Sequence, residues 1–63
     1  MNEFEKGVMY AVVQILEHDE PVMASYILRE SGYNELDCSV LDKQDRIILR
    51  KVQKEKGIHL IGL

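Results

Sequence analysis

Residues 8–21 read Val8-Met9-Tyr10-Ala11-Val12-Val13-Gln14-Ile15-Leu16-Glu17-His18-Asp19-Glu20-Pro21, and this stretch decides the fold. Its apolar residues recur at the three- and four-residue spacing of an α-helix, and it ends in an acidic turn followed by a proline. Proline suits the first position of a helix because its missing N–H would be unpaired there. The stretch therefore predicts two helices joined by a very short link, as an antiparallel or steeply crossed hairpin.

The first of these helices is predicted from about Glu3 to His18. Asn2 is a good N-cap residue, and Glu5 completes a capping-box pattern. At 100° per residue the apolar side chains span roughly 200°. An arc this wide predicts a helix at the centre of the core, buried on two sides, against the rest of the monomer and against something else. Its apolar members are Phe4, Val8, Met9, Ala11, Val12, Val13, Ile15 and Leu16.

The second helix is predicted from Pro21 to about Ser31, with Gly32 as a left-handed terminator. One side of it carries Val22, Met23, Tyr26 and Ile27, with Ala24 and Leu28 beside them. Residues 33–42 are less regular, since Asn, Asp and Ser favour turns and caps. We expect Leu36, Val40 and Leu41 to plug the core from this segment.

A third helix is predicted from Lys43 to Lys56, capped by Asp42 and ended by Gly57. Its inner face comprises Ile48, Leu49 and Val52. The tail, residues 58–63, is apolar to its last residue, so we expect it to dock, along its own core or across a twofold partner. The chain thus reads as one all-α domain over residues 1–63: a helical hairpin, a third, basic helix and a short docked C-terminal tail.

The charges of the chain are strongly segregated. Residues 1–42 hold nine acids and two bases, a net charge of −7, whereas residues 43–56 hold six bases and two acids, a net charge of +4. The whole chain carries −3. The third helix is therefore basic within an acidic protein, and we expect it to face an acid, from its own chain or from a partner.

The candidate partner-binding residues lie on that helix. Lys43, Arg46, Arg50 and Lys54 share one face at spacings of three, four and four residues, and Ile47 lies among them. Three interpretations stay open: a solvated face partly neutralised by the chain's own acids, a site for an acidic protein or second protomer, and a phosphate-contacting face on nucleic acid. Tyr10, on the polar side of the first helix, is a further candidate contact residue or a cover for the loop after Gly32.

The sequence carries no catalytic signature. It has no glycine-rich phosphate loop, no nucleophile elbow and no paired cysteines. His18 with its neighbouring acids is explained by helix capping, and no second ligand group lies at a metal-binding spacing. We therefore expect no enzyme activity, no cofactor and no metal, and a lone, buried or half-buried thiol at Cys38.

The length of the chain predicts association. A domain of 63 residues buries only about 60% of the surface of its unfolded chain, and small domains usually need a disulfide, a metal or a partner. With one cysteine, a homodimer is the expected form. There is no apolar run of about 18 residues to span a membrane and no basic signal sequence, so we expect a cytoplasmic protein with a reduced thiol.

The apolar helix Val8–Leu16, the turn His18-Asp19-Glu20-Pro21, the pairs Met23-Ala24 and Ile27-Leu28, and the terminal Gly62-Leu63 together resemble short orphan proteins encoded by phages and prophages. The resemblance covers most of the chain and implies no catalytic or binding residues. It implies a small binder that acts on a host or phage protein by occupying a surface.

From these observations we expect a non-catalytic binding or regulatory protein that acts through protein–protein contacts. The alternative is a small dimeric DNA-binding regulator that lays its basic third helix on phosphates. Against this alternative stand the long link between the second and third helices, the overall acidity of the chain and the few outward polar residues that read bases.

Overall fold

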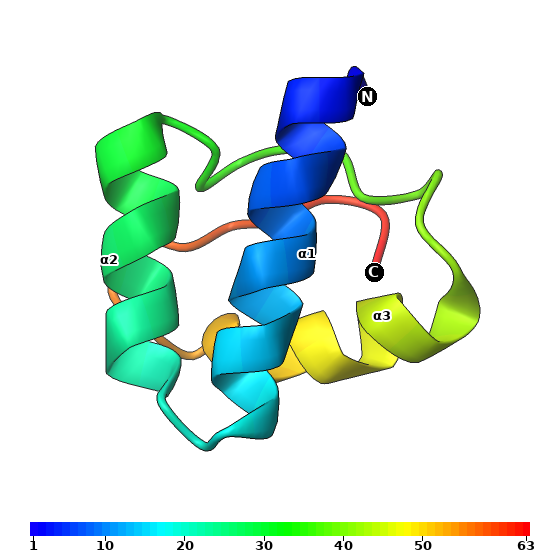
Figure 1. Cartoon of the computed structure of the whole chain (residues 1–63). Helices are drawn as coiled ribbons and strands as arrows, with labels where there is room; N and C mark the ends of the chain where they lie inside the picture. The colour runs from blue at the N-terminus through cyan, green and yellow to red at the C-terminus, as the bar shows by residue number, and fades with distance from the viewer.

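The computed structural model describes all 63 residues and contains three α-helices and one short 3₁₀-helix. The elements are α1 (Glu3–Glu17), α2 (Pro21–Ser31), α3 (Lys43–Leu49) and η1 (Arg50–Val52). Figure 1 shows α1 and α2 side by side as an antiparallel hairpin, with α3 lying across its turn end and the C-terminal tail passing behind it. This is the all-α three-helix domain with a docked tail that the sequence predicts.

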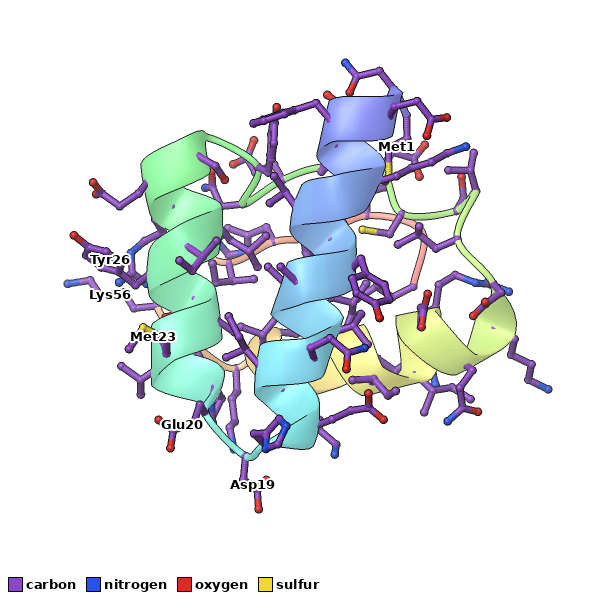
Figure 2. All side chains as sticks on the ribbon, in the orientation of Figure 1. Met1, Asp19, Glu20, Met23, Tyr26 and Lys56 are labelled. Carbon is purple, nitrogen blue, oxygen red and sulfur yellow. The ribbon has the colours of Figure 1, made fainter.

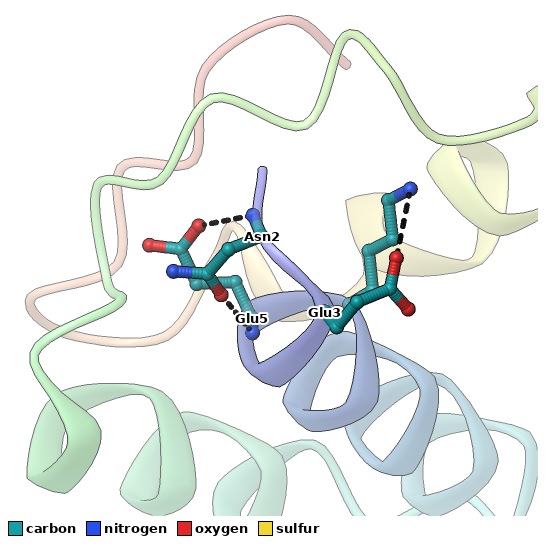
Figure 3. A network of polar contacts seen from close by, with 4 residues as sticks. Asn2, Glu3 and Glu5 are labelled. Carbon is teal, nitrogen blue, oxygen red and sulfur yellow. Dashed lines mark hydrogen bonds and ion pairs between the residues drawn. The ribbon is translucent and has the colours of Figure 1, made fainter.

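Local signals fix both ends of α1. Asn2 accepts a hydrogen bond from the Glu5 N–H (2.8 Å), and the Glu5 side chain accepts one from the Asn2 N–H (2.9 Å), which confirms the capping box (Figure 3). The last helical residue is Glu17, one residue before the predicted end, and His18 is the C-cap. Asp19 then adopts a positive φ of 61°, a conformation that Asp tolerates better than most residues, and the chain reverses into α2.

The core is built around α1, as predicted, but the buried arc of this helix is narrower. Met9, Val12, Val13 and Leu16 are its buried residues, and they span about 100° at 100° per residue. Both α2 and α3 pack against α1. Phe4, at the edge of the predicted arc, is 70% exposed and meets the Tyr33 ring edge-on at 6.4 Å.

Helix α2 begins and ends where the sequence predicts, and it turns inward the face beside Val22, Met23 and Tyr26. Its buried residues are Ala24, Ser25 and Leu28. The Ser25 hydroxyl is satisfied because it donates to the Val22 carbonyl (2.7 Å). Small side chains let α2 approach α1 closely, so the larger residues on the other side, Val22 and Tyr26 among them, remain exposed.

The prediction of a third helix from Lys43 to Lys56 is wrong in its length. The α-helix ends at Leu49, η1 follows to Val52, and turns lead to Gly57, which has a φ of 82°. Distant partners capture this part of the backbone: Arg29 donates to the Lys56 carbonyl (2.9 Å) and Asn34 to the Gly57 carbonyl (3.0 Å). Such bonds compete with the continuation of a helix, and the turn at Gly57 brings Ile58 into the core.

Between α2 and α3, one predicted core residue faces solvent. Val40 is 62% exposed because it lies in a turn closed by the Leu41 N–H and the Cys38 carbonyl (3.0 Å). Leu36 and Leu41 pack against the core as predicted, and Cys38 is fully buried among the core side chains. The sequence prediction of a buried thiol is thus confirmed.

The tail docks on its own chain. Ile58 and Leu60 are buried, and Asp37 and Ile61 form an isolated parallel β-bridge. Gln53 holds both main-chain groups of Leu60, donating to its carbonyl (3.0 Å) and accepting from its N–H (2.8 Å). The tail therefore completes the core as a short extended segment.

Candidate binding surface

The basic face of α3 forms one wall of a small cavity. Its lining residues are Lys43, Arg46 and Ile47 from α3, Arg50 from η1 and Leu63 from the tail, and its volume is about 150 Å³. The helical spacing explains the gathering, since residues 43, 46, 47 and 50 fall on one side of a continuous helical path. The buried side chains of this path, Ile48 and Leu49, point the other way.

The docked tail shapes this cavity. Arg50 donates from Nη2 to the main-chain oxygen of Leu63 at 2.7 Å, which joins the end of the tail to the first residue of η1. This bond uses one of the five donors of the Arg50 guanidinium, so the others stay available to a ligand. The apolar side chains of Ile47 and Leu63 add two non-polar walls between the charges.

Arg46 is the most constrained cation of the surface. Its side chain is half-buried, and its Nε is buried with no hydrogen-bond partner. A buried N–H without a partner is unfavourable, and most such groups in proteins are paired. The guanidinium is therefore held at the cavity with donor capacity that the chain itself does not use.

None of the bases in residues 43–56 forms an ion pair with an acid of the chain. The structure contains one salt bridge, between Lys6 and Glu3 at 3.8 Å on the exposed side of α1 (Figure 3). The chain's own acids therefore do not contact the basic face. The positive charge of the surface remains uncompensated by direct pairing.

The acids of this region gather on the inner side of α3 instead. Asp42 caps the helix by accepting from the Asp45 N–H at 2.9 Å. Partial burial, and secondarily the charges of Asp42 and Glu17, raise the pKa of the Asp45 carboxyl. Like charges thus meet between α3 and the end of α1, while the cations lie on the opposite face of α3.

The structure brings together four of the six residues that the sequence marks as candidates. Lys54 follows η1 in a turn and does not line the cavity, because the helix that would have aligned it ends early. Tyr10 is 65% exposed on α1 and also lies outside the cavity. Leu63 is the lining residue that the sequence did not mark. Its apolar position in the tail indicated docking, but nothing local indicated Arg50 as its partner.

The thiol of Cys38 is poorly suited to nucleophilic chemistry. Burial, and secondarily the neighbouring Asp37, raise its pKa to about 11, so the thiol stays protonated at neutral pH. Its only polar contact is to the Leu36 carbonyl at 3.5 Å. No three His, Cys, Asp or Glu side chains are grouped so that they could hold a metal ion. None of the helices has both the length and the apolar character that a membrane crossing requires.

Comparison of the chain with protein-family models, with curated proteins and with solved structures gave no match. The interpretation of the surface therefore rests on its residues alone.

Proposed function

We propose that this chain is a non-catalytic protein-binding protein, and that the cavity beside α3 receives a carboxylate side chain from an acidic segment of a protein partner. Lys43 and Arg46 supply positive charge from α3, and Arg50 supplies it from η1. Arginine presents a planar fork of donors that matches the two oxygens of a carboxylate.

The observation that carries this proposal is that no acidic side chain of the chain forms an ion pair with these bases. The only salt bridge of the chain lies elsewhere, and Arg46 Nε is buried without an acceptor. A carboxylate in the cavity brings the opposite charge to the three bases that line it. The same ligand meets Ile47 and Leu63, which suit the methylene groups of a glutamate side chain.

An acidic protein fits this surface better than a DNA backbone. The bases are grouped around a cavity of about 150 Å³, and the α-helix beneath them has seven residues. Lys54, which would have extended the row toward further phosphates, lies past the end of η1. The net charge of −3 also opposes the long-range attraction that DNA binding normally uses.

The remaining parts of the proposal concern setting and chemistry. The protein works without a cofactor and in the cytoplasm, where the buried Cys38 stays a free thiol. Its partner is a host or phage protein, in line with the resemblance to short phage-encoded proteins. The raised pKa of the Cys38 thiol is consistent with a role that involves no covalent chemistry.

The test is fluorescence anisotropy with a labelled hexaglutamate peptide and, in parallel, a labelled short DNA duplex. We expect saturable binding of the peptide and a loss of affinity of about tenfold or more in Arg46→Gln/Arg50→Gln, because two charged hydrogen-bonding groups are removed. The matched control is Lys51→Gln/Lys54→Gln, which loses the same charge outside the cavity and should weaken binding by less than about threefold.

Equal losses in the two double variants would show non-specific attraction and contradict the proposal. Tight duplex binding that depends on Arg46 and Arg50 would favour the DNA-binding alternative instead. Circular dichroism of each variant separates loss of binding from loss of folding.

A further inference from the structure

The outer face of α2 is an apolar surface that no part of the chain covers. Val22 is 68% exposed, Met23 51% and Tyr26 54%, although all three are large and lie within two helical turns. With Glu20 they line an open groove of about 420 Å³. Single exposed apolar residues are ordinary, whereas a cluster of this kind marks an interaction surface.

This cluster, which we call the α2 groove, is separate from the cavity beside α3, because no residue lines both. The sequence predicts an external contact on α1, but the apolar side of α1 packs largely against α2 and α3. The uncovered apolar surface of the chain lies instead on the side of α2 that faces away from α1.

An acidic residue, Glu20, lines the α2 groove, and a basic residue outside the lining, Lys56, lies next to it. Glu20 lies at the hairpin end, whereas Lys56 lies beside Tyr26, near the middle of α2, as Figure 2 shows. Arg29 fixes this placement, since its Nη1 donates to the Lys56 carbonyl at 2.9 Å and to the Ser25 hydroxyl at 3.1 Å. The main chain at Lys56 is thus tied to α2, about two turns from Glu20 along the helix.

We propose that the α2 groove is a self-association interface, in which two copies meet through antiparallel α2 helices related by a twofold axis. A surface that carries an acid and a base at separate positions is complementary to itself after a rotation of 180°. Glu20 of each copy then lies near Lys56 and Arg29 of the second copy, and the apolar residues between them are buried together.

The helix register places the twofold axis between Met23 and Tyr26. Met23 of one copy then faces Tyr26 of the second copy, a sulfur–aromatic contact that is favourable in proteins. The chain gains burial that a 63-residue monomer lacks, which gives the association a thermodynamic reason. The cavity beside α3 takes no part in this interface, so peptide binding and dimerisation can be measured independently.

The decisive experiment is a charge exchange followed by sedimentation equilibrium over a wide micromolar range. Glu20→Lys and Lys56→Glu should each raise the dissociation constant of the dimer about fivefold, since each places like charges across the axis. The double variant Glu20→Lys/Lys56→Glu should recover the parental value. An equimolar mixture of the two single variants should also dimerise better than either alone, because the mixed pair restores opposite charges at both contacts.

The apolar part of the α2 groove is tested by Tyr26→Ala, which should weaken the dimer about tenfold or more because an aromatic anchor is lost. Val40→Ala is the control, since Val40 is also more than half exposed (62%) but lies in the loop before α3. A parent chain that stays monomeric at every concentration would overturn the proposal. So would a dimer that is insensitive to Tyr26→Ala, or charge variants that show no mutual rescue.

Discussion

The α1–α2 hairpin and the second half of the chain, residues 33–63, are held together in different ways. In the hairpin, the structure follows from neighbours in the sequence: the capping box at Asn2 and Glu5, the proline that opens α2 and the left-handed Gly32 that ends it. In the second half, side chains hold main-chain groups that are distant along the chain. Asn34 donates to Gly57, and Arg29 donates to Lys56.

The hairpin acts as the scaffold of the molecule, whereas residues 33–63 carry the candidate binding site. The hairpin supplies half of the buried apolar core, and the lengths and ends of its helices are set locally. The second half is irregular, with seven residues of α-helix, one 3₁₀ turn and an extended tail, yet it provides all five residues of the cavity beside α3. The candidate binding surface is therefore one face of a short helical segment, closed by a long-range contact between Arg50 and Leu63.

The largest effect is expected where the hairpin enters the core. Val12 is fully buried in α1, so Val12→Asp places a charge among apolar side chains and should unfold the protein, a loss of about 3 kcal/mol or more. Ala11→Asp adds the same charge at the exposed neighbouring position and should leave the far-ultraviolet circular dichroism unchanged. A folded Val12→Asp protein would remove α1 from the centre of this account.

Shortening side chains in the tail tests whether residues 58–63 form part of the core. Ile58 is 1% exposed, so Ile58→Ala should lower the free energy of unfolding by about 2–4 kcal/mol through the cavity it creates. Ile61→Ala, at a position that is 57% exposed, should change it by less than about 0.5 kcal/mol. Urea titration measures both, and similar losses at the two positions would mean that the tail does not dock as described.

Two glycines, one in each half, should respond with opposite signs. An added Cβ at Gly62, where φ is 78°, would lie 2.7 Å from Asp37 Oδ1 and 2.8 Å from the Ser39 nitrogen, so Gly62→Ala should destabilise by about 2–3 kcal/mol. Gly7 lies inside α1 with nothing near its Cβ position, so Gly7→Ala should stabilise by about 1 kcal/mol. Thermal unfolding compares them, and a stabilising Gly62→Ala would contradict the packing of the tail.

A smaller effect is expected at high pH from Cys38. Its pKa rises from 9.0 to about 11 on folding, so the folded protein keeps a proton that the unfolded chain releases. Its contribution to stability is complete below pH 9 and declines as the pH rises toward 11, by about 1–2 kcal/mol. The comparison is with Cys38→Ala, whose unfolding free energy should fall less steeply over the same window. Parallel curves would show that the thiol does not resist ionisation.

The hairpin was easier to predict from the sequence than residues 33–63. The starts and ends of α1 and α2 were predictable because caps, proline and glycine act over three or four residues. The inward face of α2 was not, because apolar side chains surround this helix and only packing against α1 selects Ala24 and Leu28 over Val22 and Tyr26. The third helix was predicted too long because Lys54 and Glu55 are good helix formers, whereas Gln53 is engaged by Leu60 from the tail.

The candidate site was predictable only in part. Lys43, Arg46, Ile47 and Arg50 share a helical spacing, so the sequence placed them on one face. The position of Leu63 and the exclusion of Lys54 depend on where the tail docks, which no local pattern encodes. The lack of ion pairs at the basic face could not be predicted either, because the chain holds more acids than bases and offered many possible partners.

The central claim is that the second half of the chain forms a site for a carboxylate. Its most direct test is a titration of the ¹⁵N-labelled protein with hexaglutamate, followed through the backbone amide resonances and the Arg side-chain Nε–H signals. The account predicts saturable shifts at residues 43–50 and 63, with the outer face of α2 unaffected. Shifts spread over all basic residues alike, or confined to α1 and α2, would contradict it.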